Sequence, residues 1–455
     1  MKKIEVSQNL INLAKIFSAP LYITGGYVRN SLLGLPVYDT DICSPLPPQK
    51  VIQLLSCTPY KVASSINSLG TLKIICGDEK YEYTTLRKDI YGKGGQHRPQ
   101  RVEFCDSVLS DAQRRDFTVN AIYYDIINEK ITDPLGGAED LNNKIIRAYD
   151  PQKIFSSDGL RLLRMVRFAC ELGFDIDQST FSEAKNCHAL LKDIKGERIF
   201  EELNKILVSD TKYNINDSPH YRGVKMLKEL NLLPIIFPGM ELCYGVSQRE
   251  DFHKYDVFEH TAQTVKYSHS GIRLAALLHD IGKGIMFREN ANFYKHEITG
   301  SEKAKQLLGQ SGLKCPNKLI EETVFLIKYH MYDINGKTKD NKIRLFIAKN
   351  QKYLDKLLLL KQADYLGCGL HRGISPTALK WLKLHKQMTE QNAPLSLKQL
   401  NIGGEQIAEM GCKKENISKV LNRLFCDCVL HPHLNEEQTL RQKAARYIYL
   451  YNKKG

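Results

Sequence analysis

The chain has 455 residues, too many for a single hydrophobic core, so its length predicts about two to four domains. Its 65 Lys and Arg against 51 Asp and Glu leave a formal net charge of +14, which favours a polyanionic partner such as nucleic acid or a phosphate-rich ligand. The twelve cysteines show neither a disulfide framework nor a zinc pattern, and no apolar run approaches the ~18 residues of a membrane span. We therefore expect a cytoplasmic protein without a membrane partner.

The sequence pattern changes near residue 147. Residues 1–147 carry short β-rich runs that stand too close together for βαβ crossovers throughout, which predicts a small α/β domain with a mixed or antiparallel sheet. Apolar residues then recur with a 3.6-residue period almost to the end of the chain, which predicts helices. Residues 371–455 hold 14 Lys and Arg against 7 Asp and Glu, so half of the excess positive charge lies in this last segment.

The stretch TGGYVRNSLLGLPVYDTDI (24–42) combines two glycines, an arginine and two aspartates. A strand candidate ends at Gly25 and Gly26 and a short helix follows, which brings backbone N–H groups and the positive helix end to a place where a phosphate can approach. Asp39 and Asp41 would point to the same face of a strand and repel each other unless a cation such as Mg²⁺ lies between them. Together these elements predict nucleotidyl transfer, with a triphosphate on the glycine turn and two metal ions on the aspartates.

Four segments closely resemble, in this order and spacing, the class II tRNA nucleotidyltransferases and the related bacterial poly(A) polymerases. They are GGYVRNSLLGLPVYDTDI (25–42), RRDFTVNAIYYD (114–125), SDGLRLLRMVRFACELGF (157–174) and GERIFEELNKIL (196–207). The resemblance implies that Asp39 and Asp41 are the catalytic residues and the Mg²⁺ ligands. It also implies a nucleotide site made of Gly25, Gly26, Arg29, Arg87, Arg115, Asp116, Asn120 and Arg164, with Glu82 beside Arg87. Asn30 departs from the pattern, because the family usually has Asp there.

Ser156 or Ser157 is expected to cap a helix that begins around Asp158, so that Asp158 and Arg161 lie three residues apart on one face. A carboxylate accepts from the amino group of cytosine or adenine, and a guanidinium donates to the ring nitrogen beside it, whereas guanine and uracil present the opposite pattern. Such a pair would admit C and A only. An ordinary surface salt bridge is the alternative. The resemblance implies the reading role, since the family's EDxxR motif performs it, although Ser157 replaces the usual Glu.

The segment between Arg87 and Arg101 is rich in Gly and basic residues, which predicts a mobile loop. In the family that this chain resembles, a loop here helps the site to switch from C to A, and enzymes that add only CC lack it. This chain keeps a related form, GGQHRP. The loop therefore argues against a CC-only enzyme and leaves an A-adding enzyme open.

Histidines cluster between residues 253 and 330, and a His-Asp pair closes an apolar helix there. Adjacent imidazole and carboxylate groups predict a divalent metal site with mixed nitrogen and oxygen ligands. The segment 245–370 resembles the HD phosphohydrolase family. The resemblance implies that a divalent metal of unassigned identity is held by His260, His279, Asp280 and Asp364. It further implies a second metal or a phosphate contact at His296, His330 and Lys283. The alternative is a degenerate HD fold that serves only as a scaffold.

These resemblances imply an α+β chain in which a nucleotidyltransferase head with a small mixed or antiparallel sheet precedes an all-α remainder. The implied segments are a head (1–147), a helical neck and body with the nucleotide template and an RNA-binding region (148–240), an HD domain (245–370) and a basic, tRNA-binding helical tail (371–455). The leading interpretation is an enzyme that adds and repairs the 3′-terminal CCA of tRNA from CTP and ATP, with no protein partner implied. An A-adding enzyme, a poly(A) polymerase, and an HD phosphohydrolase with an RNA-binding head are the alternatives.

Overall fold

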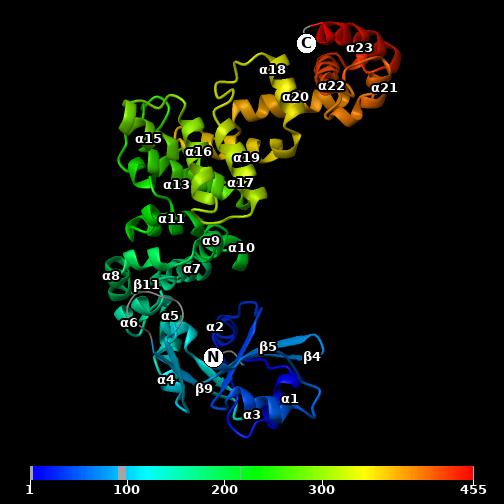
Figure 1. The fold of residues 1–455 in the computed structure, drawn as a ribbon. Coiled ribbons are helices and arrows are strands. Elements are labelled where there is room, and N and C mark those ends of the chain that lie inside the picture. The colour runs from blue at the N-terminus through cyan, green and yellow to red at the C-terminus, as the bar shows by residue number, and fades with distance from the viewer. Residues whose placement is uncertain (1–3, 91–98, 216, 454–455) are drawn as a thin grey trace. The chain divides into compact units, whose positions relative to one another are not determined.

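The computed structural model describes residues 4–90, 99–215 and 217–453 of the chain. The backbone divides into two compact units. The first unit contains residues 1–241 and 307–315, and the second contains residues 242–306 and 316–455. Strands gather in the N-terminal part of the chain, and helices make up the rest (Figure 1). No helix in the described part of the chain has both the length and the apolar character that a membrane crossing needs.

A mixed seven-stranded sheet, with strand order β3-β4-β5-β2-β1-β8-β9, forms the centre of the N-terminal region. Its strands are β1 (Tyr22–Thr24), β2 (Thr40–Ser44), β3 (Lys61–Ile66), β4 (Thr71–Cys76), β5 (Glu79–Thr85), β8 (Tyr123–Asp125) and β9 (Lys130–Thr132). Neighbouring strands are antiparallel except β2 and β5, which are parallel. Two small sheets pair β6 (Arg87–Ile90) with β7 (Arg101–Phe104), and β10 (Ile145–Ile146) with β11 (Asp175–Ile176). The predicted mixed sheet is confirmed.

The helices of this region are α1 (Gln8–Ile16), α2 (Gly26–Leu33), α3 (Pro48–Leu55), α4 (Val108–Ala112) and α5 (Gly137–Asn143). α2 follows β1 after a single residue, Gly25, whose φ of +68° suits glycine. The helix ends at Gly34, again at positive φ, where the backbone N–H bonds to the carbonyls of Asn30 and Ser31. The predicted sequence of strand, glycine turn and short helix is therefore confirmed.

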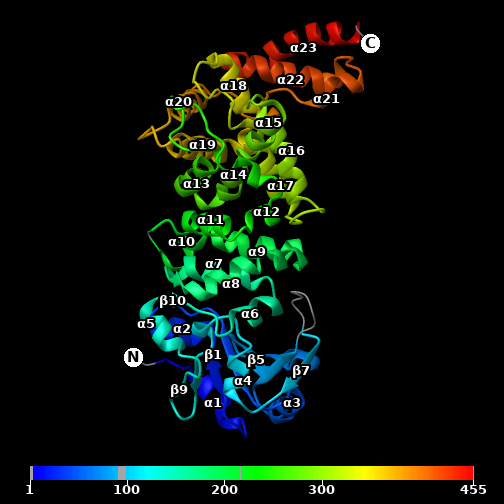
Figure 2. The ribbon, with the colours of Figure 1, turned by 90° about the vertical axis from the view of Figure 1, so that its left-hand side faces the viewer.

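The remaining elements of the first unit are helical. They are α6 (Pro151–Ser157), α7 (Arg161–Leu172), α8 (Gln178–Asn186), η3 (His188–Asp193), α9 (Gly196–Leu207), α10 (Ser209–Tyr213), α11 (Pro219–Glu229) and α12 (Leu233–Ile236). α7 packs against α9, α10 and α11 through a largely buried apolar face (Figure 2). It ends at Gly173, which adopts a left-handed conformation and closes the last turn.

The predicted helix start around Asp158 is wrong. α6 ends at Ser157, and the hydroxyl of this serine donates to the carbonyl three residues earlier instead of capping the next helix. Asp158 is extended, and Gly159 lies so close to Leu190 that a Cβ there would come within 2.4 Å of the Leu190 carbonyl oxygen. This close approach separates two helices, so α7 begins only at Arg161.

The second unit is helical throughout its described part. Its helices are α13 (Val257–Tyr267), α14 (Arg273–Leu278), α15 (Ile281–Asn290), α16 (His296–Leu308), α17 (Asn317–Tyr329), α18 (Asp340–Lys349), α19 (Gln351–Gly367), α20 (Pro376–Glu390), α21 (Gly404–Glu409), α22 (Lys414–Leu430) and α23 (Glu437–Asn452). α13 packs along α19, and α14 and α17 complete this core, while α18 packs against α20 and α22. The predicted helical remainder is confirmed, and the division into four segments stays a proposal.

Candidate functional site

The carboxylate of Asp41 lies directly against Gly25. The antiparallel register of β1 and β2 pairs Thr24 with Asp41, so this aspartate stands beside the turn that ends β1. A Cβ at position 25 would come within 2.9 Å of Oδ2 of Asp41. The parallel register of β2 and β5 places Glu82 opposite Asp41, and Asp39 stands one residue before β2. The fold thus places Glu82 and Asp39 near Asp41, which itself lies against a residue without a side chain.

The charge around Asp41 is only partly balanced by the protein. Burial raises the pKa of Asp41, the guanidinium groups of Arg115 and Arg164 oppose this rise, and the carboxylates of Glu82 and Asp39 add to it. A divalent cation binds neighbouring carboxylate oxygens and removes their mutual repulsion. The residues present therefore fit the predicted role of Asp39 and Asp41 as ligands of a divalent metal.

A buried carboxylate, Asp111, holds Arg115 beside the glycine turn. Oδ2 of Asp111 accepts from Nε of Arg115 at 3.1 Å and from the hydroxyl of Tyr123 at 2.7 Å, while Oδ1 accepts from Nε of Arg114 at 2.9 Å. Burial opposes ionisation, yet the charges of Arg114 and Arg115 lower the pKa of Asp111 to about 2. Nη1 of Arg115 lies 3.9 Å from the position that a Cβ on Gly25 would take. The predicted arginine therefore reaches the predicted phosphate turn.

Arg29, Asn120, Asp116 and Arg164 form a continuous chain of hydrogen bonds. Nη1 of Arg29 donates to Oδ1 of Asn120 at 2.6 Å, and Nδ2 of Asn120 donates to Oδ1 of Asp116 at 2.9 Å. Arg164 donates to Oδ2 of Asp116 through Nε at 2.8 Å and Nη2 at 2.5 Å. Although burial opposes it, the charge of Arg164 holds the pKa of Asp116 well below its usual range. The structure thus brings together four residues that the sequence assigned to one nucleotide site.

The ring of Phe168 supports three guanidinium groups. Those of Arg29, Arg164 and Arg167 lie 5.0, 5.3 and 4.1 Å from the ring centroid. Phe168 is buried, and a cation–π contact at a desolvated site contributes up to about 2 kcal/mol. The Phe168 ring therefore helps to hold Arg29 and Arg164, two of the predicted nucleotide-binding arginines, in place.

Asn30, the departure from the family pattern, orients Arg29. Its Oδ1 accepts from Nε and Nη2 of Arg29 at 3.1 and 2.9 Å. Its amide donates to the carbonyl of Pro36 at 2.7 Å and to the hydroxyl of Tyr213 at 2.9 Å. An aspartate could keep the bonds to Arg29 but has no donor for the Pro36 carbonyl, so the amide suits this environment.

Asp158 and Arg161 have separate anchors in the structure. Oδ1 of Asp158 accepts from the backbone N–H of Leu160 at 3.0 Å. Arg161 donates through Nη1 to the hydroxyl of Ser157 at 2.9 Å and through Nη2 to the carbonyl of Arg114 at 2.8 Å. The predicted arrangement on one helix face is not found, because only Arg161 belongs to α7. Ser157 nevertheless braces Arg161, so the serine in place of the usual Glu still supports this side chain.

Arg87 is held by its own neighbours. Its Nε lies 2.9 Å from Oδ1 of Asp89, and its Nη1 donates to the carbonyl of Leu69. Its backbone N–H donates to Oδ1 of Asp111 at 3.2 Å, and Oδ2 of Asp89 lies 3.6 Å from Nη1 of Arg114, so Arg87 is linked to the arginines that Asp111 holds. Gly26 is the first residue of α2. The loop predicted after Arg87 includes residues 91–98, which lie outside the described residues.

Four of the predicted metal ligands converge in the second unit. Nε2 of His260 lies 3.0 Å from Oδ1 of Asp364, 3.4 Å from Oδ2 of Asp280 and 3.2 Å from Nε2 of His279. Nε2 of His279 lies 3.2 Å from Oδ2 of Asp280. Although burial opposes it, the charges of His279 and Lys283 hold the pKa of Asp280 well below its usual range. The predicted set therefore meets around one point.

The second oxygen of Asp280 faces a second pair of histidines. Its Oδ1 lies 3.2 Å from Nε2 of His296 and 3.6 Å from Nε2 of His330. Nζ of Lys283 lies 2.7 Å from the other oxygen, Oδ2, and donates to Oε1 of Gln248 at 2.8 Å. Asp280 therefore stands between two groups of ring nitrogens, as a carboxylate that bridges two metal ions would.

The histidine rings are oriented as metal ligands usually are. Nδ1 of His279, His296 and His330 lies 2.7–2.9 Å from the backbone carbonyl three residues earlier, which turns Nε2 toward Asp280. Both oxygens of Asp280 are buried; Oδ2 pairs with Lys283, and both oxygens face ring nitrogens of the histidines. Buried carboxylates are costly unless they are paired or coordinate a metal. The donor set therefore fits a divalent cation.

A glycine contact sets the distance between α15 and α16. A Cβ on Gly282 would lie 2.1 Å from the carbonyl oxygen of His296 and 2.7 Å from the backbone nitrogen of Gly300. Gly282 stands between Asp280 and Lys283 in the chain. The close approach of backbones at this residue therefore brings His296 to Asp280.

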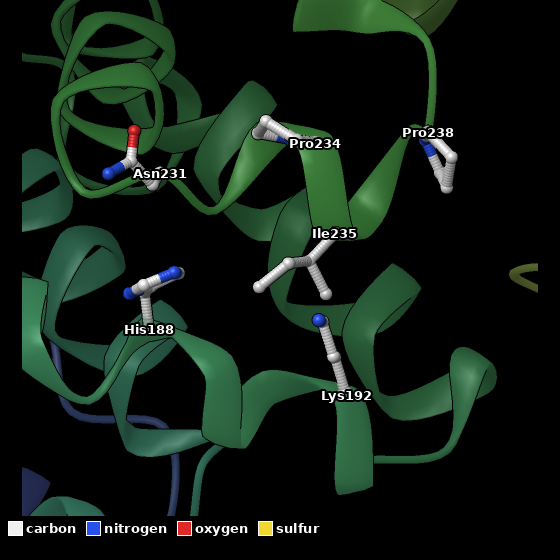
Figure 3. Close-up of a pocket in the computed structure, with 6 residues that line it drawn as sticks. All are labelled: His188, Lys192, Asn231, Pro234, Ile235 and Pro238. Carbon is white, nitrogen blue, oxygen red and sulfur yellow. The ribbon is translucent and has the colours of Figure 1, made fainter.

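A hollow of about 510 Å³ lies elsewhere in the first unit (Figure 3). Its lining residues are His188, Lys192, Asn231, Pro234, Ile235 and Pro238. Figure 3 shows the Lys192 side chain directed toward Ile235 on the facing segment. None of the predicted site residues contributes to this lining.

Three family models match the chain. The poly A polymerase head domain matches residues 21–147, the probable RNA and SrmB-binding site of polymerase A matches residues 173–243, and the HD domain matches residues 257–367. Residues 21–147 are thus similar to a poly A polymerase head domain, and residues 257–367 are similar to an HD domain. The two resemblances read from the sequence are thereby confirmed.

Curated relatives are CCA-adding enzymes. Those of Lactobacillus helveticus (strain DPC 4571) and Streptococcus sanguinis (strain SK36) are each 38% identical, over 221 and 209 residues. The alignments cover 46% and 45% of this chain, and 54% and 51% of those proteins, so the match spans about half the length of each relative.

Solved structures share the fold over nearly the whole chain. The Bacillus stearothermophilus CCA-adding enzyme in complex with CTP has a TM-score of 0.66 at 21% identity and 98% coverage of both chains. The Thermotoga maritima CCA-adding enzyme complexed with tRNA has a TM-score of 0.60 at 18% identity, covering 97% of this chain and 96% of that one. At these identities the likeness establishes the fold.

Sequence analysis missed several residues of the head. Asp111 is buried and anchors two arginines, and it stands four residues before Arg115 on the chain, a helical spacing that would have revealed the pair. Phe168 stands four residues after Arg164 on α7, so the same helical spacing could have indicated this contact. Tyr123 carried no such signal, because it meets Asp111 and Arg115 through the fold. His253 and Cys368, which lie close to His260, were also not singled out.

We predict that Gly25→Ala abolishes binding of Mn²⁺·CTP by the full chain. The added methyl group would meet Oδ2 of Asp41 at 2.9 Å, at a backbone conformation that costs about 1–3 kcal/mol for a residue with a side chain. Binding is measured by calorimetry and folding by thermal denaturation. Gly77→Ala is the matched control, because Gly77 also has positive φ but no atom within 4 Å of its Cβ position. Unchanged Mn²⁺·CTP binding by Gly25→Ala would contradict the assignment.

We predict that Gly282→Ala lowers the metal affinity of the HD domain by about tenfold or more, a loss typical of displaced supporting groups. The methyl group would push α16 away and carry His296 with it. Metal content after dialysis against Co²⁺ is the measurement. In the control, Gly404→Ala, the methyl group meets only an ordinary contact at 3.6 Å. Equal cobalt content in the two variants and the wild type would show that the position of α16 does not determine metal binding.

Proposed function

We propose that this chain is a tRNA nucleotidyltransferase that adds and repairs the 3′-terminal CCA of tRNA from CTP and ATP. The observation that carries the proposal is the contact between Asp41 and Gly25, with Glu82 in register and Arg115 held beside the turn. This arrangement places metal-binding carboxylates next to a phosphate-binding turn. The similarity to curated CCA-adding enzymes supports the same activity.

The residues of the head divide the work of nucleotidyl transfer. Mg²⁺ held by Asp39 and Asp41 would activate the RNA hydroxyl and stabilise the leaving pyrophosphate when bound. The first turn of α2, which starts at Gly26, offers backbone N–H groups and a positive dipole to the triphosphate. Arg29 and Arg115, already fixed by Asn120 and Asp111, add positive charge without a further loss of side-chain freedom. In the reaction the RNA 3′ oxygen bonds to the α-phosphorus, pyrophosphate leaves, and the hydroxyl proton passes to solvent.

Nucleotide selection is assigned to Asp158 and Arg161. The carboxylate would accept from the amino group of C or A, and the guanidinium would donate to the neighbouring ring nitrogen. The bond from Ser157 to Arg161 and the backbone bond to Asp158 limit the movement of both groups. A base with the opposite pattern would leave buried groups unpaired, which costs about 1–3 kcal/mol for each group. Selection of C and A then follows from protein groups alone.

RNA binding is assigned to the helical part of the first unit and to the basic tail, residues 371–455. All the residues that line the hollow of Figure 3 lie within the segment matched by the RNA-binding family model, and Lys192 is a basic residue among them. The 14 Lys and Arg of residues 371–455 would attract phosphates without reading bases, which makes binding dependent on salt.

We predict that the purified chain adds two C and one A in turn to tRNAs that lack the last three, two or one nucleotides. Each tRNA is incubated with each nucleoside triphosphate separately and with Mg²⁺. Asp41→Ala should lose addition while it retains tRNA binding, because the RNA is held elsewhere. Addition of A alone by the wild type would establish an A-adding enzyme or a poly(A) polymerase instead. Substantial addition by both Asp39→Ala and Asp41→Ala would contradict the metal assignment.

The HD domain supports a second activity, metal-dependent hydrolysis of a phosphoester such as a 2′,3′-cyclic phosphate. Asp280 stands between two groups of histidine nitrogens, and Lys283 can contact the phosphate. A metal bound there would supply a water nucleophile near neutral pH. A damaged RNA end with a cyclic phosphate must be opened before a nucleotide can be added, so hydrolysis would precede addition at the same RNA end.

We predict that Asp280→Ala loses phosphodiesterase activity with Mn²⁺, Ni²⁺ or Mg²⁺ and keeps CCA addition. The predicted HD ligands and the predicted nucleotidyltransferase residues lie in different compact units, so the loss of hydrolysis should not impair CCA addition. Asp355→Ala, a change at an exposed position of α19, is the matched control. Inactivity of the wild type with every metal on cyclic and monoester substrates would contradict hydrolysis. Joint loss of folding and both activities in Asp280→Ala would favour the scaffold role.

A further inference from the structure

His253 and Cys368 lie beside the HD ligand His260 and have no role in the assignments above. Each of the three offers one ligand atom, and these atoms all lie within 4.8 Å of one another. Cys368 follows the metal-ligand candidate Asp364 by one helical turn at the end of α19. His253 precedes α13, and the next residue, Lys254, donates its backbone N–H to the carbonyl of Cys368 at 2.9 Å. The backbone therefore holds the loop and the end of α19 together.

The two nitrogen atoms of His260 have different surroundings. Nε2 faces Asp364, Asp280 and His279, as described above. Nδ1 is buried and has no hydrogen-bond partner, whereas Nδ1 of each of the other three histidines in the centre meets a backbone carbonyl. His260 itself is fully buried. An unpaired ring nitrogen at such a position costs free energy unless something binds it.

His253 also has a ring nitrogen without a hydrogen-bond partner. This atom, Nδ1, is buried, and the His253 ring lies 4.6 Å from the His260 ring in an edge-to-face arrangement. The thiol of Cys368 contacts only the carbonyl of Asp364, at 3.4 Å, among the hydrogen bonds of the described residues. Each of the two rings thus has one buried nitrogen without a hydrogen-bond partner, and each ring places a nitrogen within 4.8 Å of the thiol.

We propose that His253, His260 and Cys368 form a further cation site that shares His260 with the HD centre and takes a thiophilic divalent ion of the Zn²⁺ class. Imidazole and thiolate are the ligands that Zn²⁺ prefers, and three of them leave a fourth position for water or an anion. His260 would bind the HD metal through Nε2 and the further ion through Nδ1. On binding, the thiol of Cys368 and the Nδ1–H of His260 each release one proton to solvent, since ligands must be deprotonated.

The site has a consequence for metal identity. The HD ligands themselves are nitrogen and oxygen atoms, which bind many divalent metals, whereas a thiolate restricts the choice to softer ions. Because His260 is shared, an ion at this site would change the charge on a ligand of the HD metal. The full chain should therefore bind one thiophilic ion more than the HD centre alone accounts for. This inference rests on the HD metal ligands and does not depend on hydrolysis.

Co²⁺ binding to the full-length metal-free chain tests the proposal, because a cobalt–thiolate bond absorbs strongly in the near ultraviolet. We expect this charge-transfer band in the wild type and its loss in Cys368→Ser, with one equivalent less of bound cobalt. Cys426→Ser is the matched control, since Cys426 is also a partly exposed cysteine of the second unit, and its band should stay unchanged.

His253→Gln provides a second variant in case Cys368→Ser does not fold, as judged by circular dichroism. We expect it to weaken the cobalt affinity associated with the band by tenfold or more while the remaining cobalt stays bound. The proposal is overturned if the wild type shows no thiolate band at saturating Co²⁺. It is equally overturned if the band survives in a folded Cys368→Ser, because another cysteine would then supply the sulfur.

Discussion

The position of Asp41 against Gly25 is the constraint on which the rest of the head depends. β2 lies between β1 and β5, so one register brings the aspartate to the glycine turn and the other brings it opposite Glu82. A side chain at position 25 would fill the space that the carboxylate occupies. The sheet therefore gathers negative charge beside the turn that we propose to hold phosphate, and a divalent cation would balance the two.

The arginines around this point are positioned before any nucleotide arrives. Asp111 and Tyr123 fix Arg115, while Phe168 lies beneath Arg29 and Arg164. Because these guanidinium groups already have partners, substrate binding does not have to order them, which reduces the entropic cost of binding. Preorganised positive charge of this kind also stabilises the charge that develops on the phosphates during transfer.

The sequence allowed much of both sites to be predicted, because their signals are local. The glycine turn lies between a strand and a helix, Asp39 and Asp41 are two residues apart, and the His279–Asp280 pair closes an apolar helix. These patterns depend on spacing within one element, and the family resemblances added the more distant ligands. Residues within one element could therefore be proposed from their spacing, although Asp111, four residues before Arg115, was overlooked.

Contacts between residues that are distant in the chain could not be predicted from the sequence. Glu82 reaches Asp41 through strand pairing, and Tyr123 reaches Asp111 through packing, so neither relation has a spacing to read. The start of α7 at Arg161 was missed, because the close approach of Gly159 to the Leu190 backbone interrupts the helix that was predicted from Asp158. Local propensity fails where a contact of this kind overrides it.

A crystal structure of the full chain with Mn²⁺ and a non-hydrolysable CTP analogue tests the central claim most directly, because manganese is located by its anomalous scattering. The account predicts a manganese peak between the carboxylates of Asp39 and Asp41, with the triphosphate on the turn at Gly25 and Gly26 and within reach of Arg29. A triphosphate bound away from this turn, or manganese at other carboxylates with Asp39 and Asp41 free of metal, would contradict it.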